Sequence, residues 1–209
     1  MDRVYVAFET GARPVQNVVA KSRHDKPLYI TAGAQRVLNP GTARQTIEPT
    51  EDLVVSPRRF ELEPGGERTL RLLLKKPAAS DEVVYRIVLL PQADSFERQI
   101  IDVKMNGELR KVDVITGLVM NVVSRPAQPS LKITWKVDGE ELIVTNAGNT
   151  EVLLESGQFC PEEQEQCYPV PSKRLYAGNS FGLRVPEPGV FRFMKRHGEE
   201  FQQLVMTVK

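Results

Sequence analysis

Residues 60–74 read FELEPGGERTLRLLL, and this stretch indicates the fold class. Apolar residues alternate with charged ones around Phe60 and Leu62, the Pro-Gly-Gly of residues 64–66 interrupts the run, and the alternation resumes over residues 70–74. A period of two residues places successive side chains on opposite faces of a β-strand. The stretch therefore predicts two strands that are joined by a turn.

The same short alternation recurs along the chain, for example at residues 28–34 and 85–89. Asn106-Gly107 and Asp138-Gly139 are two-residue hairpin signals between candidate strands. Long helical periodicity is almost absent. With about seven strand candidates in each half of the chain, the pattern predicts an all-β protein of the sandwich type.

The stretch that separates the two halves is residues 124–129, which read SRPAQP. Two prolines within four residues break strand pairing and stiffen a short connector. A chain of 209 residues suits two domains of about 100 residues each. We therefore predict a first domain over 1–124, an elbow over 125–129 and a second domain over 130–209.

Composition excludes several classes of function. The 28 basic and 27 acidic residues leave a net charge of +1, so nothing global indicates binding to nucleic acid or to an anionic membrane. The apolar runs are too short to span a bilayer, so no membrane insertion is expected.

Catalytic and metal motifs are also missing from the sequence. It has no Gly-rich phosphate loop, no His-Glu-x-x-His and no Gly-x-Ser-x-Gly. His24 and His197 lie in polar, turn-like contexts and are predicted to be surface residues. We expect no enzyme, no cofactor and no metal.

The two cysteines, Cys160 and Cys167, are separated by six residues. They could form a disulfide, remain free thiols or supply half of a metal site. Neither histidine is near them in sequence, which disfavours metal, and the acidic spacer disfavours a reactive thiol. A local structural disulfide is the preferred interpretation, and it implies an oxidising compartment.

Four stretches carry a resemblance: LVVSPRRFELEPGGERTLRL at 53–72, DEVVYRIVLLP at 81–91, GLVMNVVSRP at 117–126 and LIVTNAGN at 142–149. Their order and spacing resemble the periplasmic pilus chaperones of the chaperone–usher family. The placement of the cysteine pair and the Tyr-Arg-Ile of the second stretch are most similar to the alternate branch of that family. This branch serves common-pilus and colonisation-factor type fimbriae.

The resemblance implies two immunoglobulin-like β-sandwich domains in an L or boomerang arrangement. It implies a periplasmic protein whose signal peptide, which is not visible in this sequence, has been removed. Its partners would be pilin subunits, both major and tip, and an outer-membrane usher. Such chaperones complete the fold of a pilin by lending it a strand, the mode of recognition called β-augmentation.

The strand to be lent would be the last strand of the first domain, predicted over 110–124. The resemblance implies that its pilin-binding side chains are Val112, Val114, Thr116 and Leu118, which share one face. Met120 and Val122 would continue that face into the domain's own core. Periodicity alone would favour an ordinary strand that is buried throughout. The long polar stretch 92–108 before it predicts a flexible loop or an extension of the strand pair.

The family holds the C-terminal carboxylate of the pilin with an arginine on the first strand and a lysine on the lent strand. The matching positions here are Tyr5 and Asn121. Because neither position carries a cation, the candidate residues for this anchor are the cations Arg3, Lys21 and Arg86 and, at the lysine position, the neutral Asn121.

Two structural expectations concern the elbow and the second domain. Glu82, Arg125 and Glu187 resemble the family's interdomain salt bridge, which would fix the angle between the domains more than it adds stability. Trp135 alternates with apolar residues and is predicted to lie in the core of the second domain.

The alternative function is a fimbrial subunit or adhesin built of tandem immunoglobulin-like domains. That alternative expects polymerisation and an N-terminal extension for donation, whereas this sequence begins directly in a candidate strand. An exposed apolar edge would also make a self-capping dimer plausible.

Overall fold

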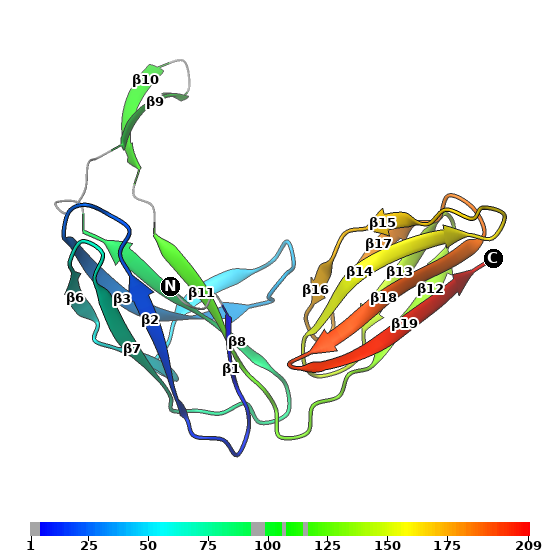
Figure 1. Ribbon diagram of the computed structural model, residues 1–209, viewed down its shortest axis with the longest axis horizontal. Coiled ribbons are helices and arrows are strands. Elements are labelled where there is room, and N and C mark those ends of the chain that lie inside the picture. The colour runs from blue at the N-terminus through cyan, green and yellow to red at the C-terminus, as the bar shows by residue number, and fades with distance from the viewer. Residues whose placement is uncertain (1–4, 93–98, 106–107, 115–116) are drawn as a thin grey trace. The chain divides into compact units, whose positions relative to one another are not determined.

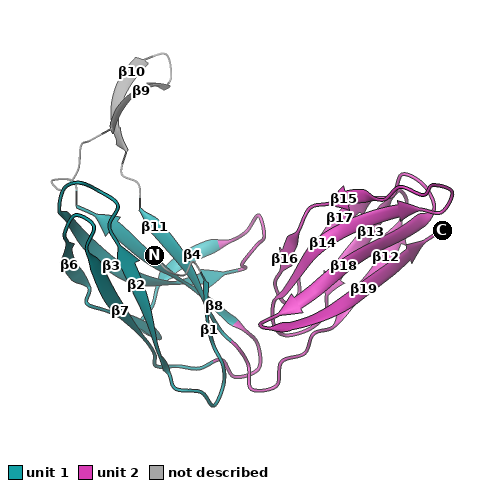
Figure 2. Ribbon diagram, viewed as in Figure 1, with its two compact units in different colours: residues 1–38, 46–77, 83–124 teal, residues 39–45, 78–82, 125–209 magenta. Residues whose placement is uncertain are grey.

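The computed structural model describes residues 5–92, 99–105, 108–114 and 117–209. All regular structure within these residues is β, as predicted, and it forms two units (Figures 1 and 2). Unit 1 comprises residues 1–38, 46–77 and 83–124, and unit 2 comprises residues 39–45, 78–82 and 125–209. The chain leaves unit 1 for the last time after Ser124. Unit 2 also includes two short segments from the part of the chain that the sequence assigned to the first domain.

Unit 1 contains two sheets that enclose a core. The larger sheet has the strand order β1-β11-β8-β3-β4, with β6 also paired to β3, and the smaller sheet has the order β2-β7-β5. Strand β1 runs parallel to β11, whereas the other pairs in these two sheets are antiparallel. The strands are β1 (Tyr5–Phe8), β2 (Val15–Lys21), β3 (Leu28–Leu38), β4 (Thr46–Pro49), β5 (Leu53–Ser56), β6 (Arg59–Leu62), β7 (Glu67–Leu74), β8 (Val83–Pro91) and β11 (Leu118–Ser124).

The alternation in residues 60–74 explains the core of unit 1. Phe60 and Leu62 of β6 and the leucines of β7 at even positions are all buried, while the residues between them are exposed. The predicted turn lies between the two strands, where the Gly66 N–H donates to the Glu63 carbonyl at 2.8 Å. Each strand therefore places one apolar face in the core.

A separate two-stranded ladder precedes β11. Strands β9 (Gln99–Met105) and β10 (Glu108–Val114) pair antiparallel, with Met105 opposite Glu108, as the Asn-Gly signal predicted. The single strand expected over 110–124 is described as two strands instead. Strand β10 pairs with β9, whereas β11 pairs with β8 and β1.

Unit 2 also contains two sheets around one core. Their strand orders are β12-β13-β17 and β15-β14-β18-β19, with β16 also paired to β14. The second predicted hairpin is present, with Asp138 opposite Glu141 and Gly139 at a φ of 62°. The strands are β12 (Ile133–Asp138), β13 (Glu141–Asn146), β14 (Val152–Pro161), β15 (Tyr168–Val170), β16 (Lys173–Leu175), β17 (Ser180–Arg184), β18 (Gly189–His197) and β19 (Glu200–Val208).

The expectation for Trp135 is wrong. Its side chain is 42% exposed, although its cross-strand partner Val144 is fully buried. Strand β12 is at the edge of its sheet, so Trp135 has a strand neighbour on one side only among the described residues. Leu131 and Ile133, on the same predicted face, pack partly buried against the core.

Cys160 and Cys167 form the predicted disulfide. The bond joins the end of β14 to the residue before β15, and these two strands pair antiparallel. It closes a short acidic loop, and by loop entropy contributes about 2–3 kcal/mol to stability. The free-thiol and metal alternatives are thereby excluded.

The turn after β13 is held by a buried asparagine. The Asn146 side chain is fully buried, and its Nδ2 donates to the carbonyls of Thr150 at 2.8 Å and Leu175 at 2.9 Å. Its Oδ1 accepts the Gly148 N–H at 2.9 Å. A Cβ at Gly148 would lie 1.9 Å from the Ser130 carbonyl oxygen, so the turn requires glycine there.

We predict that Gly148→Ala lowers the free energy of unfolding of unit 2 by about 3 kcal/mol or more, because backbone must move to admit the methyl group. Urea unfolding followed by Trp135 fluorescence measures the change. Ala147→Ser, which adds one heavy atom at the exposed neighbouring residue, is the control and should change stability little. An unchanged midpoint for Gly148→Ala would contradict the close approach.

Candidate functional site

Strand β11 has unequal neighbours on its two sides. Strand β8 pairs with it along its full length, from Leu118 to Ser124. Strand β1 pairs with it on the other side only from Asn121 to Ser124 (Figure 1). In the described part of the chain, the first three residues of β11 therefore have a strand neighbour on the β8 side alone.

Burial changes along β11 at the same place. Met120 and Val122 are fully buried in the core of unit 1, as predicted. Leu118 lies on the same face of the strand but is 56% exposed, although its partner Leu89 on β8 is buried. Val119, on the opposite face, is 51% exposed. The apolar face of the strand is thus exposed at Leu118 and lies inside the core from Met120 onward.

Of the four residues predicted to bind a client, Val112 and Val114 lie on β10, which pairs with β9, and Thr116 lies outside the described residues. The assignment of all four residues stays a prediction. Leu118 is the member of the predicted set whose exposure is described.

A row of polar side chains crosses the outer face of the larger sheet. Tyr5 is opposite Asn121, Asn121 is opposite Arg86, and Arg86 is opposite Gln35, so the row runs over β1, β11, β8 and β3. All four side chains are partly buried. Their strand neighbours, such as Ile87, point to the core, which places the row on the face away from it.

Arg86 lies in the middle of this row. Its Nε is buried and has no hydrogen-bond partner among the described residues. A buried donor without an acceptor is costly, so an acceptor supplied by a ligand would be favoured. A carboxylate is suited to this position because a guanidinium binds it with charge-assisted, often bidentate hydrogen bonds.

The structure brings Arg86 and Asn121 together but separates Lys21 from them. Lys21 lies at the end of β2 in the smaller sheet, where its exposed ammonium pairs with Glu67 at 2.8 Å. Arg3 lies outside the described residues. Gln35 was missed from the sequence, because only the register of β3 against β8 places it beside Arg86.

A second cluster, in unit 2, surrounds the carboxylate of Glu82. Its Oε2 accepts a hydrogen bond from the Thr150 hydroxyl at 2.7 Å and one from the Glu151 N–H at 3.3 Å. The Glu82 N–H donates to the Asn149 carbonyl at 2.9 Å. The carboxylate of Glu151 is itself buried and pairs with Arg174.

Burial, together with the negative charge of Glu151, raises the pKa of Glu82 to about 7. The Thr150 hydroxyl, the Glu151 backbone and the positive charge of Arg125 oppose this rise without cancelling it. Glu82 is therefore protonated in a large part of the folded molecules at neutral pH.

The predicted salt-bridge triad is only partly brought together. Arg125 is 5% exposed and lies by Gly198, whose Cβ would be 3.2 Å from the guanidinium Nη1. Gly198 follows the last residue of β18, whereas Glu187 precedes its first residue. The nine residues of β18 therefore separate Glu187 from Arg125 by roughly 30 Å. Glu187 instead accepts a hydrogen bond from Gln164 Nε2 at 2.9 Å. The acidic side chain next to Glu82 is that of Glu151 and not that of Glu187. The sequence did not indicate this neighbour.

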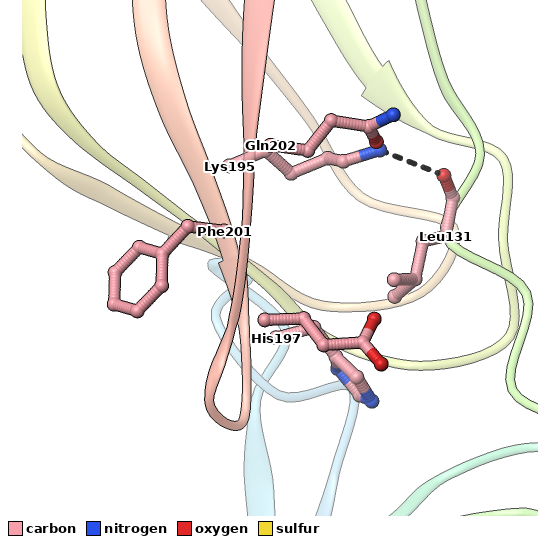
Figure 3. A pocket seen from close by; sticks show the side chains of 6 residues that line it. Leu131, Lys195, His197, Phe201 and Gln202 are labelled. Carbon is pink, nitrogen blue, oxygen red and sulfur yellow. Dashed lines mark hydrogen bonds between the residues drawn. The ribbon is translucent and has the colours of Figure 1, made fainter.

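Unit 2 carries a pocket beside β18 and β19 (Figure 3). In Figure 3, Lys195 Nζ donates a hydrogen bond to the Leu131 carbonyl at 3.4 Å. The Phe201 ring points away from both residues. None of its lining residues is a serine, threonine or cysteine. They are Leu131, Lys195, His197, Glu200, Phe201 and Gln202.

The two histidines differ in their surroundings. His24 is exposed, as predicted, whereas His197 is partly buried with Nδ1 3.2 Å from the Glu151 carbonyl oxygen. No group of three possible metal ligands was found in the described residues. No helix there is long and apolar enough to cross a membrane.

Comparison with solved structures places the fold among the fimbrial chaperones with two immunoglobulin-like domains. The class 5 fimbriae chaperone CfaA superposes with a TM-score of 0.67 at 20% identity, covering 98% of this chain and 95% of that chain. A chain from the complex of the Salmonella enterica SafA pilin with the SafB chaperone gives a TM-score of 0.62 at 13% identity, covering 99% and 94%. The predicted all-β fold with two immunoglobulin-like domains is confirmed.

Two curated proteins of Escherichia coli, each named as a fimbrial subunit, are similar in sequence. The protein of the CFA/I fimbriae is 26% identical over 204 residues, which cover 94% of this chain and 84% of that protein. The protein of the CS1 fimbriae is 25% identical over 191 residues, which cover 86% and 77%. No family model matches the chain. The predicted resemblance to fimbrial chaperones is confirmed at the level of the fold by the similarity to CfaA.

The raised pKa of Glu82 predicts a dependence of stability on pH. Between about pH 4.5 and pH 7 the folded protein keeps a proton that the unfolded chain releases, so stability falls as pH rises through this window. Glu82→Gln stays neutral and can still accept from Thr150. We predict a smaller fall in Tm between pH 5 and pH 8 for this variant than for the wild type.

Asp81→Asn, at the exposed neighbouring acid, is the matched control and should keep the wild-type difference in Tm. Equal pH profiles for Glu82→Gln and the wild type would show that Glu82 is ionised throughout this range.

Proposed function

We propose that this protein is a periplasmic, non-enzymatic chaperone that binds pilin subunits, lends them a strand and delivers them to an outer-membrane usher. The observation that carries the proposal is the exposure of Leu118 on the same strand face that buries Met120 and Val122. An apolar face that continues out of its own core is suited to complete the core of another protein.

The second requirement is a free strand edge, and among the described residues Leu118–Met120 have no strand neighbour on the side away from β8. Backbone groups of an edge strand can pair with a strand of a client, and this main-chain pairing supplies affinity. Alternate side chains then enter the client's core and supply fit. No nucleotide is needed, because the client can later exchange the lent strand for one that fits better.

Arg86 and Asn121 would anchor the carboxylate at the C-terminus of the pilin. Support comes from their adjacency across β8 and β11 and from the buried Arg86 Nε that lacks an acceptor among the described residues. A fixed anchor beside the lent strand would set the register of the client on that strand. Arg86 would take the place of the arginine that the family carries on its first strand.

The names of the two curated relatives support a second candidate, a fimbrial subunit. Fimbrial subunits polymerise, whereas a chaperone forms a complex of one copy with one pilin. Size-exclusion chromatography of the protein copurified with a pilin distinguishes the two. The similarity to CfaA over nearly the whole chain favours the chaperone.

Leu118→Asp should abolish copurification with a pilin encoded in the same gene cluster. A carboxylate at this position would have to enter the apolar core of the client, which is strongly unfavourable. The thermal unfolding of the free protein should change little, because Leu118 is exposed.

The matched control is Leu73→Asp, which adds the same charge at an exposed leucine of β7 in the smaller sheet. This variant should still copurify with the pilin. If Leu118→Asp copurifies as well as Leu73→Asp does, β11 is not the binding strand.

Arg86→Gln should weaken binding of a pilin by about tenfold or more, because a charge-assisted contact is lost. A pilin extended by two glycines at its C-terminus should bind the wild type and Arg86→Gln almost equally, because its carboxylate is displaced. The control is Arg71→Gln, at an exposed arginine of β7. Equal losses with both pilins would exclude Arg86 as the carboxylate anchor.

A further inference from the structure

Strand β12 of unit 2 has an apolar free edge. In the described part of the chain it pairs with β13 alone (Figure 1). Ile133, Trp135 and Val137 share the face that points to the core, yet Trp135 is 42% and Val137 is 46% exposed. Edge strands are often blunted by a proline or a bulge, and β12 has neither in its six residues. Its lysine, Lys136, lies on the opposite face, where it pairs with Asp138 at 3.2 Å.

The backbone of β12 presents hydrogen-bonding groups at this edge. The Ala147 N–H donates to the Lys132 carbonyl at 2.7 Å, so the backbone groups of Lys132 point towards β13. In an antiparallel ladder this direction alternates from one residue to the next. The N–H and C=O groups of Ile133, Trp135 and Val137 therefore point away from β13, to the side on which the described residues supply no strand.

The sequence of β12 is complementary to itself in the antiparallel direction. The stretch that begins at Lys132 reads KITWKVD. When two copies pair with Trp135 opposite Trp135, Ile133 lies opposite Val137 and Lys132 lies opposite Asp138. Apolar pairs and pairs of opposite charge both stabilise neighbouring strands. In this register one face is apolar throughout, and each end of the other face carries a pair of opposite charges.

Charge disfavours the neighbouring registers. A change of one residue in the register would put the apolar face of one copy beside the polar face of the other, so the nearest alternatives differ by two. One alternative places Lys136 opposite Lys136, and the other places Lys132 opposite Lys136. Like charges directly opposite each other are destabilising. The charges therefore select the register that is centred on Trp135.

We infer that β12 is the contact between two copies of this chain, paired antiparallel about a two-fold axis at Trp135. The sheet β12-β13-β17 then continues through β12 of the second copy. Both copies use the same edge, so assembly stops at two. One strand from each copy makes a small interface, and the dissociation constant is on the order of 10 μM. The contact lies in unit 2, uses no residue of β11 and does not depend on the proposed function.

Charge reversal at the two ends of the strand tests this contact. Lys132→Glu should weaken self-association by about tenfold or more, because the new carboxylate lies opposite Asp138 of the second copy. Asp138→Lys should weaken it similarly, because lysine then lies opposite lysine. An equimolar mixture of the two variants should dimerise about as well as the wild type, because opposite charges then face each other at both ends. Sedimentation equilibrium between about 1 and 200 μM measures each association constant.

The mixture separates a lost contact from a lost fold, because misfolded variants could not restore the dimer. Lys173→Glu makes the same reversal at an exposed lysine of β16 in the other sheet, and it should dimerise like the wild type. Leu118→Asp leaves β12 unchanged and should also dimerise like the wild type. A wild type that stays monomeric at the highest concentration, or a mixture that associates no better than its components, would overturn the inference. Loss of the dimer in Leu118→Asp would also overturn it, because the contact would then lie at β11.

Trp135 is the single tryptophan of the chain, so its fluorescence reports on the same contact. Its emission should shift to shorter wavelength as the wild type is concentrated, because the exposed part of the ring leaves water. The emission of Lys132→Glu should shift less over the same range. A dimerising wild type whose emission does not change with concentration would show that β12 lies outside the interface.

Discussion

The structure of unit 1 depends on the register of β11 against β8. Pairing with β8 along the whole strand places Met120 and Val122 in the core, and in the described part of the chain β1 pairs with β11 from Asn121 to Ser124. The same register aligns Asn121 with Arg86 and leaves Leu118 exposed. A buried anchor, an exposed leucine and a polar row therefore follow from one set of backbone hydrogen bonds. Because a shift of one residue would exchange the two faces, the register is strongly specified.

Unit 2 depends on a different feature, a turn whose polar groups are hydrogen-bonded by the side chains of two asparagines, of which Asn146 is buried. The Asn146 side chain donates across the turn to the Thr150 carbonyl. The Asn149 side chain accepts the Ser130 N–H at 2.7 Å and donates to the Ser80 carbonyl at 2.7 Å. The turn is followed by Glu151, which faces the raised-pKa carboxylate of Glu82. Residues 78–82 are thus held to unit 2 by main-chain and side-chain hydrogen bonds, although they come from the first part of the chain. Buried polar networks of this kind fix geometry when every member is satisfied.

Local pattern was sufficient for the fold class and for most strands, because alternation, turn residues and hairpin signals act over a few residues. The burial of Met120 and the disulfide of Cys160 could be predicted in the same way. The site was predicted less completely, because cross-strand register is set by contacts far apart in sequence. Gln35 and Glu151 were missed for this reason. Trp135 was placed in the core because alternation does not reveal that its strand lies at the edge of a sheet.

The most direct test of the central claim is hydrogen exchange at the backbone amides of residues 118–120, followed by NMR in the free protein and in its complex with a pilin. Strand lending predicts that the amides on the side away from β8 exchange readily in the free protein. In the complex their exchange should slow by about tenfold or more, as expected of newly paired groups. Unchanged exchange at these residues, with new protection at another sheet edge such as β4 or β19, would contradict the account.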